Sequence, residues 1–167
     1  PASKPIAYLG DRFIQIGKPR SIPSSGSVVR ISTSLRLAPR IKEVLEREKF
    51  DIVHLHEPFM IMLCSAVLRF SNAVNIGTFH AAENRLGYRF GWPIGIMILK
   101  RRRRKLSGKI AVSRPAMNYA SKYVPGQYEI IPNGVDIERF TPDVAPIEQF
   151  CDGKQNILFL GRLEHRK

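Results

Sequence analysis

The sequence contains few cysteines, few acidic residues and no long apolar run. Its 167 residues include 2 cysteines, which is too few for a disulfide framework or a four-cysteine zinc site. Acidic residues number 14 against 27 lysines and arginines, so the net charge of +13 favours phosphates or an anionic membrane as partners. The longest apolar run, Phe59 to Leu68 with Ser65 inside it, is far short of the ~20 residues that a spanning helix needs. The low cysteine count excludes a disulfide-rich scaffold. Cys64 lies in the apolar run, so we expect it to be a small buried hydrophobic residue, which fits a reducing compartment.

Short apolar segments rich in Val and Ile alternate with helical patterns along the chain. This alternation predicts an α/β fold with a parallel sheet. The segments are mostly apolar at successive positions, which is typical of strands covered by helices on both faces. We expect strands at residues 51–56, 74–80, 109–113, 129–132 and 156–162.

Helices are expected between these strands. Leu37, Ile41 and Val44 form an apolar stripe at helical spacing, with charged residues on the opposite side. Further helices are expected from Pro58 onward, over residues 92–106, and over 114–123, where Ser113 is placed to cap the helix and Pro115 lies in its first turn.

Prolines and glycines divide the remaining segments. The first thirty residues predict a hairpin or an irregular β segment. Residues 132–153 predict an irregular connection, and we place a domain boundary after it.

Three histidines lie at or near strand ends. His54 and His56 alternate with Leu55, so they point to the same side of their strand. His80 follows the next strand, at the carboxyl edge where open α/β sheets bind ligands. We expect His54 to be hydrogen-bonded within the sheet and His80 to be a polar residue of a cleft. The alternative is a metal site made of these three histidines and Glu57.

Two further segments carry turn or ligand signals. Asn133-Gly134 predicts a tight turn. Gly161-Arg162 ends a predicted strand, and glycine permits close backbone approach while arginine donates well to a diphosphate. A solvated basic strand end is the alternative interpretation.

Taken in order, five stretches resemble the family 4 retaining glycosyltransferases of the GT-B fold. They are FDIVHLHEP (50–58), GTFHA (77–81), KIAVS (109–113), IPNGVDIERFTP (131–142) and ILFLGRLEHRK (157–167). Within that family the nearest likeness is to the phosphatidylinositol mannosyltransferases, because IPSSGSVVRI (22–31) resembles their acceptor-side loop.

The resemblance implies two Rossmann-like domains facing a cleft, with the sugar nucleotide held mainly by the C-terminal one. Residues 1–140 would form most of the acceptor-side N-terminal domain, 141–155 the interdomain connection, and 156–167 the start of the donor-binding domain. The first strand–helix–strand unit with its Gly-rich loop and the acidic E-x7-E region would be missing. We therefore expect a fragment, truncated at both ends and inactive alone.

The resemblance also implies roles for individual residues. His80 matches the active-site histidine near the transferred sugar. Arg162 and Lys167 match the basic pair on the donor diphosphate, and Arg166 matches a neighbouring donor contact. On the acceptor side, Arg30 matches a phosphate contact, whereas Ser24 and Ser25 stand where the inositol enzymes carry other polar residues. No metal is implied, because basic side chains would balance the charge of the leaving diphosphate.

Six consecutive cations, Lys100 to Lys105, have three interpretations. They could form a solvated helix end, since cations are favourable near a helix C-terminus. They could instead attach the protein to anionic lipid through Arg101, Arg102, Arg103 and Arg104, at ~1 kcal/mol per cation near such a surface. Nucleic-acid binding has the charge but no motif in its favour.

The sequence thus predicts a retaining glycosyltransferase. It would transfer a hexose, which we expect to be mannose from GDP-mannose, to a lipid or other membrane-associated acceptor. Nucleic acid is not an expected partner, and the expected location is cytoplasmic, including the cytoplasmic face of the membrane. The alternative is a non-catalytic basic module that binds nucleic acid or anionic membrane.

Overall fold

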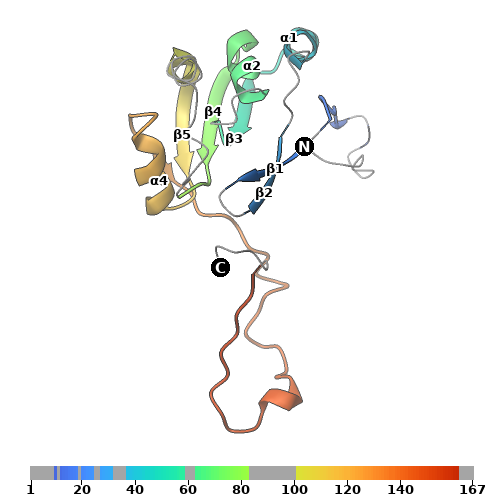
Figure 1. Cartoon of the computed structure of the whole chain (residues 1–167), viewed down its shortest axis with the longest axis vertical. Helices are drawn as coiled ribbons and strands as arrows, with labels where there is room; N and C mark the ends of the chain where they lie inside the picture. The colour runs from blue at the N-terminus through green and yellow to red at the C-terminus, as the bar shows by residue number, and fades with distance from the viewer. Residues whose placement is uncertain are drawn as a thin grey trace.

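The predicted α/β architecture is present in the computed structural model, which describes residues 10, 12–18, 20–24, 27–31, 37–58, 63–82 and 101–161. A parallel four-stranded sheet has the order β3-β4-β5-β6. Its strands are β3 (Ile52–His56), β4 (Val74–Phe79), β5 (Leu106–Ala111) and β6 (Glu129–Ile130). The Pro- and Gly-rich start of the chain forms the expected hairpin, in which β1 (Arg20–Ser24) pairs antiparallel with β2 (Ser27–Ile31). Figure 1 shows the hairpin apart from the sheet.

Among the described residues, three α-helices accompany the parallel sheet, and Figure 1 shows their arrangement. They are α1 (Leu37–Glu48), α2 (Leu63–Phe70) and α4 (Arg114–Ser121). The α4 start is as predicted, because Ser113 Oγ accepts a hydrogen bond from the Ala116 amide at 3.3 Å and Pro115 lies in the first turn. Short 3₁₀ turns occupy Arg103–Lys105 and Glu148–Phe150.

The core lies between one face of the sheet and the helices α2 and α4. It joins the buried residues Leu55, Cys64, Leu68, Phe79, Leu106, Tyr119, Ala120 and Val124. A second, smaller cluster packs α1 against α2 through Leu37, Ile41 and Ala66. Cys64 is buried, as predicted from its apolar surroundings.

The opposite face of β3 differs from the expectation of burial on both sides. Ile52, His54 and His56 share this face and are exposed in the described part of the chain. Val53 and Leu55 make the strand look continuously apolar in sequence, but only the face that carries these two residues packs against the core.

Several predicted boundaries move. β5 begins at Leu106 rather than at residue 109, so the helix expected over 92–106 ends before Leu106, and its residues 92–100 lie outside the described part. Of the helix expected from Pro58, residues 59–62 lie outside it too.

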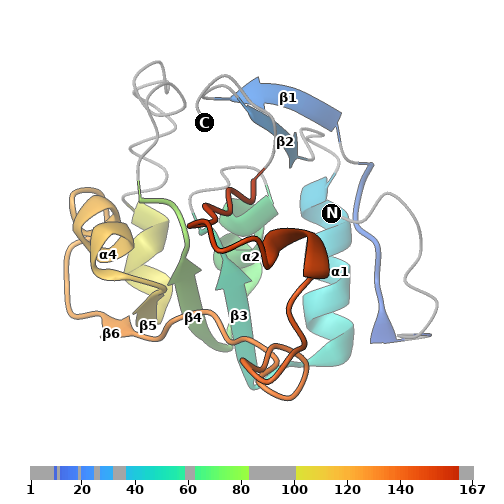
Figure 2. The same ribbon diagram turned by 90° about the horizontal axis from the view of Figure 1, so that it is seen from below.

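The strand expected at 156–162 is not formed by its described residues, 156–161. Ile157, Leu158 and Leu160 are 96%, 89% and 89% exposed. A strand requires a hydrogen-bonded neighbour, and the described sheet ends at β6, so these residues have an apolar β-like sequence without a partner strand. Figure 1 shows the segment that follows β6 extending away from the sheet, and Figure 2 shows the same arrangement from below.

Candidate functional site

The carboxyl edge of β3 and β4 brings His56 and His80 together. The parallel register pairs His56 with Thr78, so His80 follows two residues later, just past the end of β4. His56 Nδ1 and His80 Nε2 are 2.9 Å apart, and the two rings stack with centroids separated by 5.2 Å. His80 is half-buried. It therefore lies at the edge of the sheet, where the sequence placed it, and its catalytic role stays a prediction.

His54 extends the same row of rings toward the middle of the sheet. Its centroid lies 4.6 Å from that of His56, as expected for residues two positions apart on one face. His54 Nε2 is 2.7 Å from the hydroxyl oxygen of the buried Thr78. This hydrogen bond to the neighbouring strand is the structural role predicted for His54.

Glu57 holds the segment that carries His80. Its Oε1 accepts hydrogen bonds from the backbone amides of His80 and Ala81, at 2.5 and 2.7 Å. Its own amide donates to Thr78 O at 2.9 Å. Glu57 has φ of 53°, a left-handed conformation that costs a non-glycine residue roughly 1–2 kcal/mol. The two hydrogen bonds that its carboxylate accepts from backbone amides offset that cost. The end of β3 and the end of β4 are therefore locked together through one side chain.

Sequence reasoning considered Glu57 only as a possible metal ligand and missed this role. The signal was its position directly after a strand that ends beside the His80 segment. Among the described residues, no group of three or more His, Cys, Asp or Glu side chains is arranged to hold a metal ion. Oε1 of Glu57 and Nε2 of His54 already have hydrogen-bond partners, so the geometry is that of a polar network and not of a coordination shell.

The electrostatics of the row favour the neutral form of His56 by lowering its pKa. Desolvation against the sheet lowers the pKa of His56, and the nearby rings of His54 and His80 lower it further. The Glu57 carboxylate acts in the opposite direction. A neutral His56 can share a single hydrogen with His80, with one ring nitrogen donating and the other accepting.

Other predicted site residues fall in parts of which little can be said. Arg30 belongs to β2, where it pairs with Ser21 in the hairpin. The Arg30 side chain lies outside the described residues, as does Ser25. The predicted donor contacts Arg162, Arg166 and Lys167 also lie outside them, so their roles stay predictions.

The four arginines predicted to form a membrane surface do not share one environment. Arg102 donates to Ser65 O at 2.6 Å and to the Ser65 hydroxyl, and Arg103 donates to Tyr123 O. Both are half-buried, whereas Arg101 and Arg104 are exposed. Membrane attachment stays a prediction for this run. In the described ranges we find no helix with the length and apolarity required to cross a bilayer.

The chain is similar to known proteins over most of its length. The Glycosyltransferase Family 4 model matches residues 8–139, a range that includes the hairpin, β3, β4 and the His80 segment. The phosphatidyl-myo-inositol mannosyltransferase of Mycobacterium tuberculosis is 31% identical over 164 residues, which cover 98% of this chain and 42% of the relative. The proteins of the same name from Mycolicibacterium smegmatis and Propionibacterium freudenreichii are 29% and 30% identical, over 98% and 91% of this chain and 41% and 39% of theirs.

The chain thus spans about two fifths of the length of these relatives. The family match nevertheless covers most of the chain and contains the carboxyl-edge histidines. The chain belongs to glycosyltransferase family 4.

Proposed function

We propose that the protein is a retaining glycosyltransferase that moves a hexose, mannose in our expectation, from a nucleoside diphosphate sugar to a lipid acceptor. The observation that carries this proposal is the half-buried His80, fixed at the carboxyl edge of β4 by Glu57 and within the matched range 8–139. The relatives are named phosphatidyl-myo-inositol mannosyltransferases, which supports mannose as the sugar and an inositol lipid as the first acceptor to test.

His80 would contact the transferred sugar through the ring nitrogen that faces away from His56. Its Nε2 is engaged by His56, whereas Nδ1 has no hydrogen bond among the described residues. The Glu57 carboxylate holds the backbone of His80, so the ring is positioned before substrate binds. A ring that is positioned in advance favours the transition state, because it needs no reorganisation as charge develops. We assign the donor diphosphate to Arg162 and Lys167, with GDP-mannose as the first donor to test and no metal required.

The test is turnover of the full-length enzyme with a panel of sugar nucleotides. His80→Ala should lower kcat/KM by more than ten-fold, since one polar contact in such a site contributes about 2–4 kcal/mol to transition-state stabilisation. The circular dichroism spectrum should remain that of the parent, because His80 lies outside the apolar core.

Lys122→Ala is the matched control. Lys122 is an exposed cation that follows α4, an element that carries none of the histidines of the row, and its removal should leave kcat/KM unchanged. Transfer at the parental rate by a folded His80→Ala variant would contradict the proposal, as would the absence of transfer from every sugar nucleotide tried.

A lipid acceptor requires the protein to reach a membrane surface. We propose that it does so peripherally, through exposed cations of the 100–105 run. Arg101 and Arg104 are exposed and can contribute fully, whereas Arg102 and Arg103 already donate to backbone carbonyls of other segments.

A further inference from the structure

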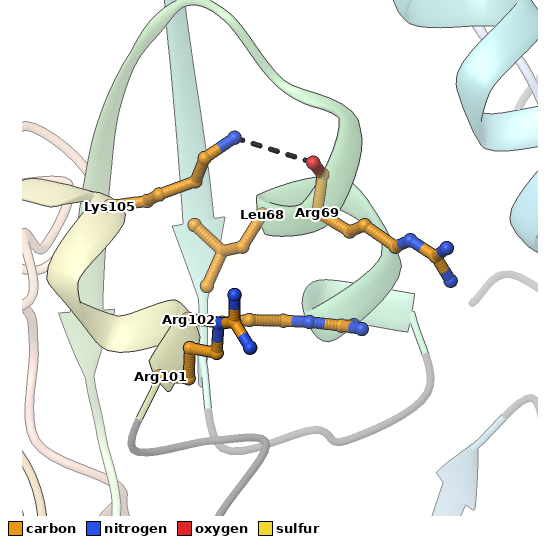
Figure 3. A pocket seen from close by; sticks show the side chains of 5 residues that line it. All are labelled: Leu68, Arg69, Arg101, Arg102 and Lys105. Atoms are coloured by element: carbon orange, nitrogen blue, oxygen red, sulfur yellow. Dashed lines mark hydrogen bonds between the residues drawn. The ribbon is translucent and has the colours of Figure 1, made fainter.

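A basic cavity lies between the end of α2 and the segment that leads into β5. Its volume is about 500 Å³, within the range of sites for small ligands. The described residues that line it are Leu68, Arg69, Arg101, Arg102 and Lys105. Four of the five carry a positive charge, and no acidic side chain of the described part lines it. Figure 3 shows that the charged side chains come from two segments, with Arg102 running toward α2.

Two of the four cations have a structural role. Arg102 donates to Ser65 O and to the Ser65 hydroxyl. Lys105 donates to Ser71 O at 2.8 Å and to Arg69 O at 3.3 Å, so it satisfies carbonyls at the end of α2. Figure 3 marks the bond between Lys105 and Arg69. These bonds fix the positions of two charges at the cavity.

The other two cations have no comparable commitment. Within the described part, Arg69 and Arg101 form neither an ion pair nor a side-chain hydrogen bond, and the Arg69 guanidinium lies over the Phe70 ring at 5.1 Å. The pKa of Arg102 is lowered by desolvation and by repulsion from Arg69, so the charges at this cavity repel one another. An anion placed among them would relieve this repulsion and accept charge-assisted hydrogen bonds.

The cavity is separate from the histidine row. Arg69 precedes β4 and Lys105 precedes β5, so these two cations lie at the amino ends of the parallel strands, whereas His80 follows the carboxyl end of β4. Six residues of β4 separate the two ends, which amounts to about 20 Å at ~3.3 Å per residue. A ligand in the basic cavity would therefore not occupy the proposed sugar site.

We propose that this cavity binds a phosphate group, with Arg69 and Arg101 as the ligand-binding cations and Arg102 and Lys105 as fixed supporting charges. The phosphate can belong to a soluble phosphomonoester or to a lipid headgroup. In both cases the chemistry is the same: guanidinium groups donate paired hydrogen bonds to phosphate oxygens. The site differs from a diffuse cationic surface because only side chains that line the cavity contribute to it.

The experiment uses the full-length protein with two kinds of probe, soluble and lipid, that present inorganic phosphate or a phosphomonoester. Inorganic phosphate and glycerol 3-phosphate are titrated calorimetrically. Phosphatidic acid vesicles are compared in cosedimentation with phosphatidylglycerol vesicles of equal charge. Arg69→Gln and Arg101→Gln should each weaken binding by about ten-fold, because each removes one charge-assisted contact. Binding should also fall as salt rises.

Arg104→Gln is the matched control, since Arg104 belongs to the same basic run, is exposed, and does not line the cavity. It should bind soluble phosphate as the parent does and should keep a preference for phosphatidic acid over phosphatidylglycerol. Circular dichroism establishes that each variant is folded.

The outcomes separate the two sources. Binding of the soluble probes identifies a free phosphomonoester site, and binding confined to phosphatidic acid vesicles identifies a headgroup site. The proposal is overturned if neither soluble probe binds and phosphatidic acid vesicles are bound no better than phosphatidylglycerol vesicles. It is equally overturned if Arg104→Gln weakens soluble-phosphate binding, or phosphatidic acid preference, as much as Arg69→Gln and Arg101→Gln do.

Discussion

A proton added to His56 would place a positive charge beside two further imidazoles. Desolvation and these neighbours hold the pKa of His56 below its ordinary value of about 6.5 in the folded state. The unfolded chain therefore binds this proton more readily than the folded chain does. It follows that the contribution of His56 to the free energy of unfolding is fully present above about pH 6.5 and is lost as the pH falls below that value.

The free energy of unfolding, measured by urea denaturation between about pH 7.5 and 5.5, should therefore decrease toward acid pH. His56→Gln should make this decrease shallower, because glutamine has no titrating proton. Histidine ring resonances in NMR give the second measurement, and the resonance lost in His56→Gln should titrate below about 6.5. A value at or above this one would show that the row does not disfavour the charge.

At the scale of one element, the packing of β4 depends on a glycine. A Cβ atom added to Gly77 would lie 2.7 Å from Pro58 Cγ and 3.2 Å from Leu106 Cδ2. The pyrrolidine ring cannot swing aside as a long side chain can, so the strand or the Glu57-Pro58 turn must move. Gly77→Ala should therefore destabilise the protein by about 1–3 kcal/mol in urea denaturation.

Gly108 in the adjacent strand is the natural control for this prediction. A Cβ atom there would lie 3.5 Å from Ile76 Cγ1, an ordinary contact, so Gly108→Ala should change the free energy of unfolding by less than about 1 kcal/mol. Equal effects of the two substitutions would show that the close approach to Pro58 does not determine the loss of stability in Gly77→Ala. Pro58 follows Glu57, whose carboxylate holds the backbone amide of His80. A displacement of Pro58 by the added methyl group should therefore also loosen the backbone of His80.

Elements whose signals are local could be predicted from the sequence. The hairpin follows from closely spaced Pro and Gly, and the start of α4 follows from Ser113 and Pro115. The start of β5 could not, because Leu106-Ser-Gly has the composition of a loop and becomes strand only through pairing with β4, across a register shift at Asn75/Ile76. The unformed strand at 156–161 shows the converse, since strand composition without a neighbour gives no strand.

The same distinction applies to the candidate site. Alternation within one strand placed His54 and His56 on one face, and strand polarity placed His80 at the carboxyl edge. The bonds of Arg102 to Ser65 and of Arg103 to Tyr123 join residues 37 and 20 positions apart in the chain. No local pattern distinguishes these two arginines from their neighbours, so only the folded chain shows which members of the run point inward.

At the scale of the whole molecule, the proposed reaction needs a donor site, which we assign to residues that follow the parallel sheet in the sequence. In the full-length protein, Arg162→Ala and Lys167→Ala should each weaken the affinity for GDP by at least ten-fold. The reason is that a charge-assisted bond to phosphate contributes about 1.5–3 kcal/mol. Isothermal titration calorimetry measures the change.

Lys154→Ala provides the comparison for the donor prediction. Lys154 is an exposed cation of the preceding segment whose ammonium lies 3.3 Å from Asp152, and its loss should leave GDP affinity intact. Parental affinity in both the Arg162 and the Lys167 variants would remove these residues from the donor site and would leave the assignment of His80 unaffected.

The exposed apolar residues 157–160 also affect how this stretch of polypeptide behaves in solution. Ile157, Leu158, Phe159 and Leu160 form an uncharged run of β-prone side chains without proline or glycine, and each is at least 68% exposed. Backbone groups in such a run readily pair with an identical copy, the arrangement from which cross-β aggregates grow. Within the described residues these four side chains have no neighbouring strand, so the 167-residue polypeptide carries an adhesive segment whose pairing its net charge of +13 opposes.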